Sequence, residues 1–157
     1  MAFEKAKAYL DRFGYADRII ETEHSSATVA EAAEALGCAE AMIAKTLSFL
    51  KDGQPVLILA DGLARVDNRK YKDTFGCKAR MIPADRVESL TGHGIGGVCP
   101  FGVNESVRVY LDESLRKHEI VYPAVGNDHS GVRLTIAELE KCSGFLAWVD
   151  VCKQPEA

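Results

Sequence analysis

The sequence lacks the features that would place it in a membrane, in an oxidising compartment or around a metal ion. Its longest aliphatic run, Val56 to Ala60, is strand-sized and far short of the roughly 20 apolar residues of a membrane span. Charged residues among the first seven positions interrupt any signal-peptide core. Five cysteines include no Cys-x-x-Cys pair, and four dispersed histidines add no ligand pattern. We therefore expect a cytoplasmic protein with reduced thiols, no metal and no other cofactor.

The chain also lacks an overall positive charge. It has 19 Lys and Arg residues against 23 Asp and Glu, a net charge of −4, so no global field draws it to nucleic acid or to an anionic membrane. Residues 65–80 are a local exception, with six basic residues and two acidic ones. Such a segment is explained equally well by a solvated helix face and by a face that binds phosphates.

The composition and the pattern of short apolar segments predict one globular domain over residues 1–157. The chain is 47% hydrophobic and 27% charged, without repeats or linkers. We expect helices near 2–13, 28–36, 39–44, 68–75, 83–90 and 135–142, and strands near 46–50, 55–60, 63–66, 79–82, 107–111, 120–124, 131–134 and 147–151. Because strands and helices do not alternate strictly, the order favours an α+β fold in which helices surround a mixed, barrel-like sheet.

The most unusual stretch is residues 92–102, which hold five of the thirteen glycines of the chain. Glycines let a ligand approach main-chain N–H and C=O groups without obstruction. The stretch contains a literal G-x-G-x-x-G, but a dinucleotide site requires a strand before the motif and a helix after it, and Pro100 interrupts any such helix. A purely structural turn without a ligand is the alternative to a ligand-binding loop.

Two side chains carry candidate chemistry. Lys45 lies between apolar residues at the start of a predicted strand, where a lysine either extends to the surface or opens onto a cleft. His93 is the one histidine inside the glycine-rich stretch, so we regard it as a candidate for proton transfer or ligand contact. No Ser/His/Asp or Cys/His arrangement is evident, and nothing near Cys99 predicts a lowered thiol pKa.

Several segments in this order resemble the YbaK family, which includes the inserted editing domain of bacterial prolyl-tRNA synthetases and its free-standing relatives. The resemblance covers about residues 20–150. It rests on Thr28 to Ala33, Ile43 to Leu47, Arg65 to Lys70, Thr91 to Gly102, Tyr110 to Asp112 and Leu134 to Leu139.

The resemblance implies hydrolysis of the ester that links a wrong amino acid to tRNA. It implies that Lys45 engages phosphate near the terminal adenosine and that the Gly96 backbone orients the scissile ester. We expect further substrate contacts from neighbouring and loop residues, namely Thr46, His93, Gly94, Gly97, Pro100 and Asn127. The expected partners are an aminoacyl-tRNA acceptor end and a prolyl-tRNA synthetase, with no membrane and no DNA.

Such a mechanism needs no strong side-chain base, because an aminoacyl ester is already activated and backbone N–H groups can stabilise the oxyanion. Relatives that act on Cys-tRNA carry a serine and an acidic residue where this chain has Ala124 and Arg133. The amino acid removed is therefore as plausibly alanine, 2-aminobutyrate, serine or threonine as cysteine. The alternatives are a non-catalytic module that binds tRNA acceptor ends or nucleotides, and a hydrolase of other small activated esters.

Overall fold

A long hairpin forms the centre of the fold. The computed structural model describes residues 2–26 and 28–155, and in it β2 (Ile43–Lys51) pairs antiparallel with β3 (Gln54–Asp61). The turn residues Asp52 and Gly53 both have positive φ, 53° and 79°, which matches the twist of the flanking strands. The hairpin predicted from the sequence is confirmed, and each strand is longer than expected.

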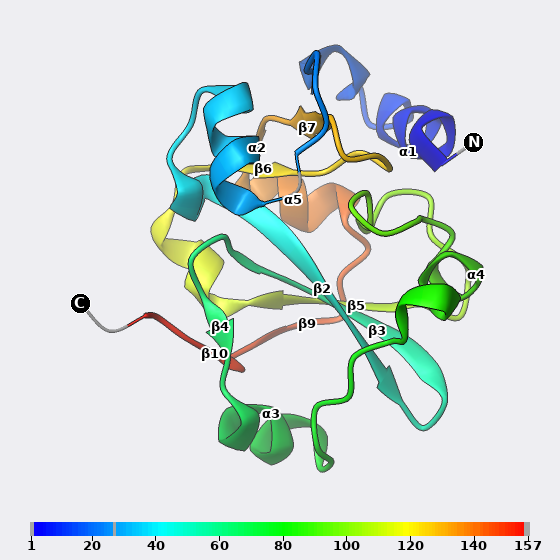
Figure 1. The fold of residues 1–157 in the computed structure, drawn as a ribbon, viewed down its shortest axis with the longest axis vertical. Coiled ribbons are helices and arrows are strands. Elements are labelled where there is room, and N and C mark those ends of the chain that lie inside the picture. The colour runs from blue at the N-terminus through cyan, green and yellow to red at the C-terminus, as the bar shows by residue number, and fades with distance from the viewer. Residues whose placement is uncertain (1, 27, 156–157) are drawn as a thin grey trace.

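Six strands form one mixed, curled sheet in the order β8-β6-β2-β3-β5-β9 (Figure 1). β2 pairs antiparallel with β3, β6 pairs antiparallel with β8, and the remaining neighbours are parallel. The outer strands are β5 (Arg108–Asp112), β6 (Ile120–Pro123), β8 (Leu134–Thr135) and β9 (Ala147–Val149). This half-barrel sheet confirms the predicted α+β architecture.

Two antiparallel ribbons of two strands each flank the main sheet. One joins β1 (Ile19–Glu21) to β7 (Ser130–Val132), and the other joins β4 (Arg65–Val66) to β10 (Cys152–Lys153). β1 and β10 were not predicted from the sequence. Segments of two or three residues are too short to show a period, and only their pairing partners define them as strands.

Five α-helices pack around the sheet: α1 (Ala2–Asp11), α2 (Val29–Leu36), α3 (Asn68–Phe75), α4 (Val87–Thr91) and α5 (Ile136–Cys142). Their starts follow the sequence signals, since Thr28 caps α2 and Thr135 and Glu138 form a complete capping box on α5. Short 3₁₀ turns lie at 16–18, 40–42, 84–86 and 113–117. Among the described residues, none of the helices has the length and apolarity to cross a bilayer.

The central hairpin separates two hydrophobic clusters. Leu57 and Leu59 of β3 face a cluster that includes α1 and α5, whereas Val56, Ile58 and Ala60 face a cluster that includes Tyr71 of α3. This is the period-two alternation of a strand buried on both faces. Successive residues of β2 therefore also point to opposite sides of the sheet.

The strand predicted at 131–134 is divided between β7 and β8, and the helix predicted at 83–90 is a 3₁₀ turn followed by α4. Two further predicted elements differ more. The strand expected at 79–82 is reduced to a single bridge between Phe49 and Met81, although the main chain still follows β2 through a bond from the Leu50 N–H to the Arg80 carbonyl. The helix expected at 39–44 is a 3₁₀ turn over 40–42, because β2 already begins at Ile43. Sheet pairing with β3 and β6 overrides the helical propensity of this alanine-containing segment.

The ion pair between Arg18 and Glu138 gives a prediction about pH. A hydrogen bond from Arg18, then one from the Thr135 N–H, lowers the pKa of Glu138 to about 2. A carboxyl group whose folded pKa lies below its unfolded pKa of roughly 4.3 stabilises the fold at higher pH and loses that effect as the pH falls. We expect Glu138→Gln, which keeps an acceptor for the capping box, to lower the melting temperature at pH 7. The difference from wild type should shrink between about pH 5 and pH 2, as followed by circular dichroism. A difference that does not change with pH would contradict a role for the charge.

Candidate functional site

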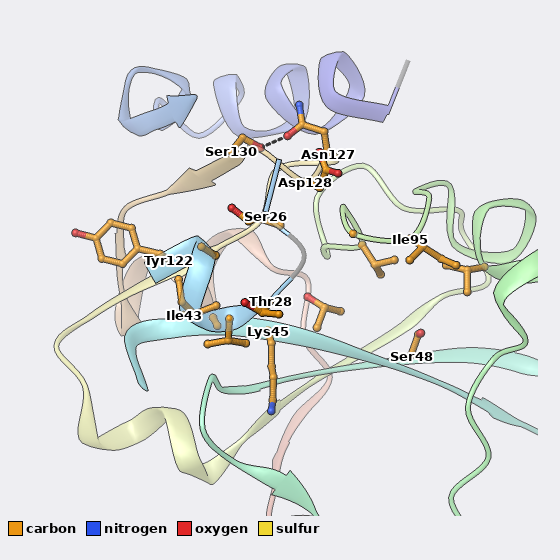
Figure 2. Close-up of a pocket in the computed structure, with 18 of the residues that line it drawn as sticks. Ser26, Thr28, Ile43, Lys45, Ser48, Ile95, Tyr122, Asn127, Asp128 and Ser130 are labelled. Atoms are coloured by element: carbon orange, nitrogen blue, oxygen red, sulfur yellow. Dashed lines mark hydrogen bonds between the residues drawn. The ribbon is translucent and has the colours of Figure 1, made fainter. Parts of the chain in front are cut away.

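A cavity of about 450 Å³ opens between β2, α2, the glycine-rich loop and the loop that precedes β7 (Figure 2). This volume is within the range of roughly 300–1,000 Å³ that is common for small-molecule sites. Two apolar side chains at the cavity, Met81 and Ile95, are 58% and 68% exposed. The walls also carry six serine and threonine side chains: Thr22, Ser26, Thr28, Thr46, Ser48 and Ser130. A mostly apolar hollow with a few placed polar groups is typical of a ligand site.

The alternation along β2 places Lys45 and its neighbours on opposite sides of the strand. Lys45 belongs to the cavity wall, but its ammonium group points away from Ser26 and Thr28, as Figure 2 shows. The Nζ atom donates hydrogen bonds to the carbonyl of Gly62 at 3.3 Å and to that of Ala64. Burial lowers the pKa of Lys45. The lysine therefore links the cavity to the turn between β3 and β4.

Two hydroxyl groups of β2 lie on the cavity side. Thr46 Oγ1 is buried and has no hydrogen-bond partner among the described residues. Ser48 is 8% exposed and lines the same cavity. In Figure 2 the Ser48 side chain points from β2 toward the side of Ile95. Buried hydroxyls without partners cost free energy, so this floor is suited to a ligand that supplies hydrogen bonds.

The glycine-rich loop presents main chain to the cavity at Gly96. The Gly97 N–H donates to the Gly94 carbonyl at 3.1 Å, which closes a tight turn, and Gly96 has a φ of +90°. A positive φ at the third residue of such a turn is the type II pattern, which favours glycine. The Gly96 N–H has no acceptor among the described residues, so it is free to bind a ligand oxygen.

The loop is held in place by close backbone contact with the segment before β7. A Cβ on Gly97 would lie 2.4 Å from the carbonyl carbon of Gly126 and 2.5 Å from the Asn127 nitrogen. A Cβ on Gly96 would lie 3.1 Å from the Asp128 Cβ. The contact therefore depends on the absence of side chains at these two positions.

The segment that contains Asn127 is internally hydrogen-bonded. The Asn127 side-chain carbonyl accepts from the Ser130 hydroxyl at 2.7 Å and from the His129 N–H at 3.0 Å. The Asp128 carbonyl accepts from the Ser26 N–H at 2.7 Å, which ties the approach to α2 to this loop. Asn127 lines the cavity, but its side-chain carbonyl serves its own loop.

The cavity brings together four of the eight predicted site residues: Lys45, Thr46, Gly96 and Asn127. Gly94 and Gly97 shape the turn from outside the wall, and Pro100 lines a different hollow beside α1. Of the two departures from the Cys-tRNA relatives, Ala124 lines the cavity, whereas Arg133 lines a separate hollow near Arg18.

His93 does not reach the cavity. Its side chain is fully buried, and Nε2 lies 2.6 Å from the Phe101 carbonyl and 3.6 Å from the Cys99 sulfur. Burial lowers the pKa of His93, so the neutral ring is favoured and it can donate to the carbonyl. The substrate contact predicted for His93 has no support in this geometry.

Burial also raises the pKa of Cys99 to about 12, which keeps its thiol protonated. Within the described residues, no group of three His, Cys, Asp or Glu side chains is placed to hold a metal ion.

Sequence reasoning missed Ser48, Ser26 and Ser130 as cavity residues. Ser48 could have been found, because it lies two residues after Thr46 in a predicted strand and such residues share a face. Ser26 and Ser130 come from loops and a short ribbon, where no period indicates the direction of a side chain.

Comparisons with known proteins agree on one family. Residues 23–142 match the model of the aminoacyl-tRNA editing domain. The chain is 44% identical to the uncharacterized protein YwhH of Bacillus subtilis, over 99% of this chain and 100% of that protein. It is 29% identical to a proline–tRNA ligase of Streptococcus suis over 79% of this chain, which spans 20% of the ligase. A crystal structure described as "a putative trans-editing enzyme for prolyl tRNA synthetase" superposes with a TM-score of 0.86 at 31% identity, covering 97% of each chain.

The close packing of the glycine-rich loop predicts a contrast between two substitutions. Gly97→Ala would place a methyl group on the backbone of residues 126 and 127, so we expect it to destabilise the fold by about 1–3 kcal/mol. Gly94→Ala is the matched control, because its Cβ would meet no atom closer than 4.0 Å. Urea unfolding followed by fluorescence of the single tryptophan measures both. Equal stabilities of the two variants would contradict the docking described here.

Proposed function

The chain belongs to the aminoacyl-tRNA editing domain family, and we propose that it is a free-standing trans-editing deacylase. Its substrate would be a mischarged tRNA, tRNA-Pro or a related tRNA, that carries a small amino acid. The observation that carries the proposal is that Gly96, whose N–H has no acceptor among the described residues, and the hydroxyl-bearing face of β2 line one cavity. Relatives that match along their whole length support a free-standing enzyme, and the ligase relatives support prolyl-tRNA synthetase as a partner.

The chemistry rests on positioning and on main-chain electrostatics. As water or the neighbouring ribose hydroxyl attacks the ester carbonyl, negative charge develops on the carbonyl oxygen. The Gly96 N–H would donate to that oxygen, and the fixed turn means that little reorganisation is needed during the reaction. Holding an activated ester and its nucleophile in line supplies the remaining rate enhancement.

Selection of the amino acid would occur at the floor of the cavity. A volume of about 450 Å³ can accept an aminoacyl group together with its ribose, so the cavity as a whole excludes little by size. Thr46 and Ser48 instead offer hydroxyls that a polar side chain can satisfy. Among alanine, 2-aminobutyrate, serine and threonine, this floor favours the two amino acids that carry a hydroxyl.

A panel of mischarged tRNAs tests the proposal. We expect the wild-type protein to release at least one small amino acid well above the spontaneous rate, as measured by loss of radiolabelled aminoacyl-tRNA. Gly96→Ala should lower turnover, because alanine is strained at a φ of +90° and its methyl group would contact Asp128. Lys45→Ala should also lower the rate of deacylation, because the proposal takes Lys45 to engage a phosphate group of the tRNA. If no ester in the panel is cleaved faster than in buffer, the deacylase proposal fails.

The outward direction of the Lys45 ammonium favours the second candidate, a non-catalytic module for acceptor ends or nucleotides. In that case the same panel would show saturable binding of tRNA by the wild-type protein without release of amino acid.

The floor hydroxyls predict a change in substrate preference. Ser48→Ala removes one hydroxyl and little volume, so we expect hydrolysis of Ser-tRNA to fall roughly threefold to tenfold, the worth of a typical hydrogen bond. Hydrolysis of Ala-tRNA should stay near the wild-type rate. Comparing kcat/KM for the two substrates provides the measurement, and an equal loss on both would show that Ser48 supports the fold rather than selection.

A further inference from the structure

The β4–β10 ribbon carries an unfavourable pairing of charges. Arg65 of β4 lies directly opposite Lys153 of β10 in the register of the ribbon, and both residues are exposed. Like charges in direct cross-strand pairs destabilise a sheet. In the described part of the chain, neither side chain has a carboxylate within salt-bridge distance. A hydrogen bond from the Lys70 N–H and, more weakly, the charge of Lys153 lower the pKa of Asp67. The ribbon therefore has one partial counter-charge but no ion pair within the described part of the chain.

The nearby carboxylates are already engaged. Asp67 accepts hydrogen bonds from the N–H groups of Arg69 and Lys70 as the cap of α3, and Asp150 pairs with the Lys70 ammonium at 3.1 Å. Lys70 also donates to the Cys152 carbonyl at 2.9 Å, so a third cation is fixed against β10. The field of the ribbon is therefore positive within a chain whose net charge is −4.

The Lys45 ammonium lies on the same side of β2 as this ribbon. It donates to the carbonyl of Ala64, the residue before Arg65. Burial is the main cause of the lowered pKa of Lys45; the charge of Asp61 acts against it, and the charge of Arg65 adds a smaller lowering effect. Figure 2 shows Lys45 pointing from β2 toward β4, away from the labelled cavity residues. Three cations, Lys45, Arg65 and Lys153, thus follow one another from the cavity wall to the ribbon.

The turn between β3 and β4 connects the cavity to the ribbon. A Cβ on Gly62 would lie 2.8 Å from Cγ1 of Val29, and Val29 lines the cavity. The next residue, Leu63, is 41% exposed and can support a base or a ribose. A chain that leaves the cavity past α2 would cross this turn and reach Arg65.

We propose that the β4–β10 ribbon is a phosphodiester-binding surface, on which Arg65 and Lys153 hold the backbone of the RNA strand whose esterified end occupies the cavity. This inference rests on the proposed function, because it takes that RNA to be the substrate. An extended anion contacts both cations at once and offsets their repulsion. Its contacts are with phosphate groups and carry no base sequence.

Substitution of Arg65 separates this role from a structural one. Arg65→Glu turns the like-charge pair into an opposite-charge pair, so we expect the melting temperature to stay the same or to rise. The same variant should raise KM for full-length aminoacyl-tRNA several-fold with kcat unchanged. Hydrolysis of an aminoacyl-adenosine, which lacks the upstream phosphates, should be unaffected. Lys153→Gln should act in the same direction on KM and more weakly.

Binding of uncharged tRNA provides the measurement that does not depend on catalysis. The plot of log affinity against log salt should lose about one unit of slope for each of Arg65→Gln and Lys153→Gln. Lys7→Gln is the matched control, because Lys7 is an exposed lysine of α1, at the opposite end of the molecule from β10 in Figure 1.

The results separate the two proposals. If Arg65→Glu has the same tRNA affinity, KM and salt slope as the wild-type protein, the ribbon assignment is wrong and the deacylase proposal still stands. If neither the wild-type protein nor any variant deacylates tRNA, but only the ribbon variants bind tRNA more weakly, the deacylase proposal is wrong and the ribbon proposal stands. An equal effect of Lys7→Gln would show attraction by general charge and would also overturn the assignment.

Discussion

The alternation of side chains along β2 is the constraint on which the site depends. β2 is fixed on one side by its pairing with β3 and on the other by β6, so the direction of each side chain follows from the register. Thr46 and Ser48 face the cavity, whereas Leu47 packs on the other side of the sheet and the Lys45 ammonium group points to that side. A shift of one residue would exchange the two sets. The same register thus supplies an uncharged, hydrogen-bonding floor on one side and a cation on the other.

The glycine-rich loop depends on a second constraint, which is contact between backbones. Gly97 can approach the segment at 126–127 only because Gly97 has no side chain, and the absence of one at Gly126 leaves room for the start of α1. That contact fixes the turn in which the Gly96 N–H has no acceptor within residues 2–26 and 28–155. A donor held by the fold loses little entropy when it binds an oxyanion, whereas a mobile donor would lose much more. Rigidity at Gly97 therefore supports the chemistry proposed at Gly96.

Much of the fold could be predicted from local signals, and the site only in part. The hairpin follows from aliphatic alternation around Asp52–Gly53, and the capping boxes locate α2 and α5. His93 shows the limit of such reasoning, because a histidine among glycines suggests a ligand contact, yet the packing of Phe101 and Cys99 buries it completely. Burial of that kind depends on contacts between distant elements, which no local pattern reports. The opposition of Arg65 and Lys153 was equally invisible, since β10 is defined only by its partner.

The proposed division of labour between cavity and ribbon would suit a deacylase that inspects many correctly charged tRNAs. Tight binding through phosphates would retain every tRNA regardless of its amino acid, because phosphate contacts carry no information about the ester. Two or three cations in a chain of net charge −4 give an attraction that is local, modest and sensitive to salt. Discrimination then falls to the floor of the cavity, where a hydroxyl that gains a partner changes the transition-state energy directly. Under this proposal, weak binding of tRNA followed by selective hydrolysis would let correctly charged tRNAs dissociate before they are cleaved.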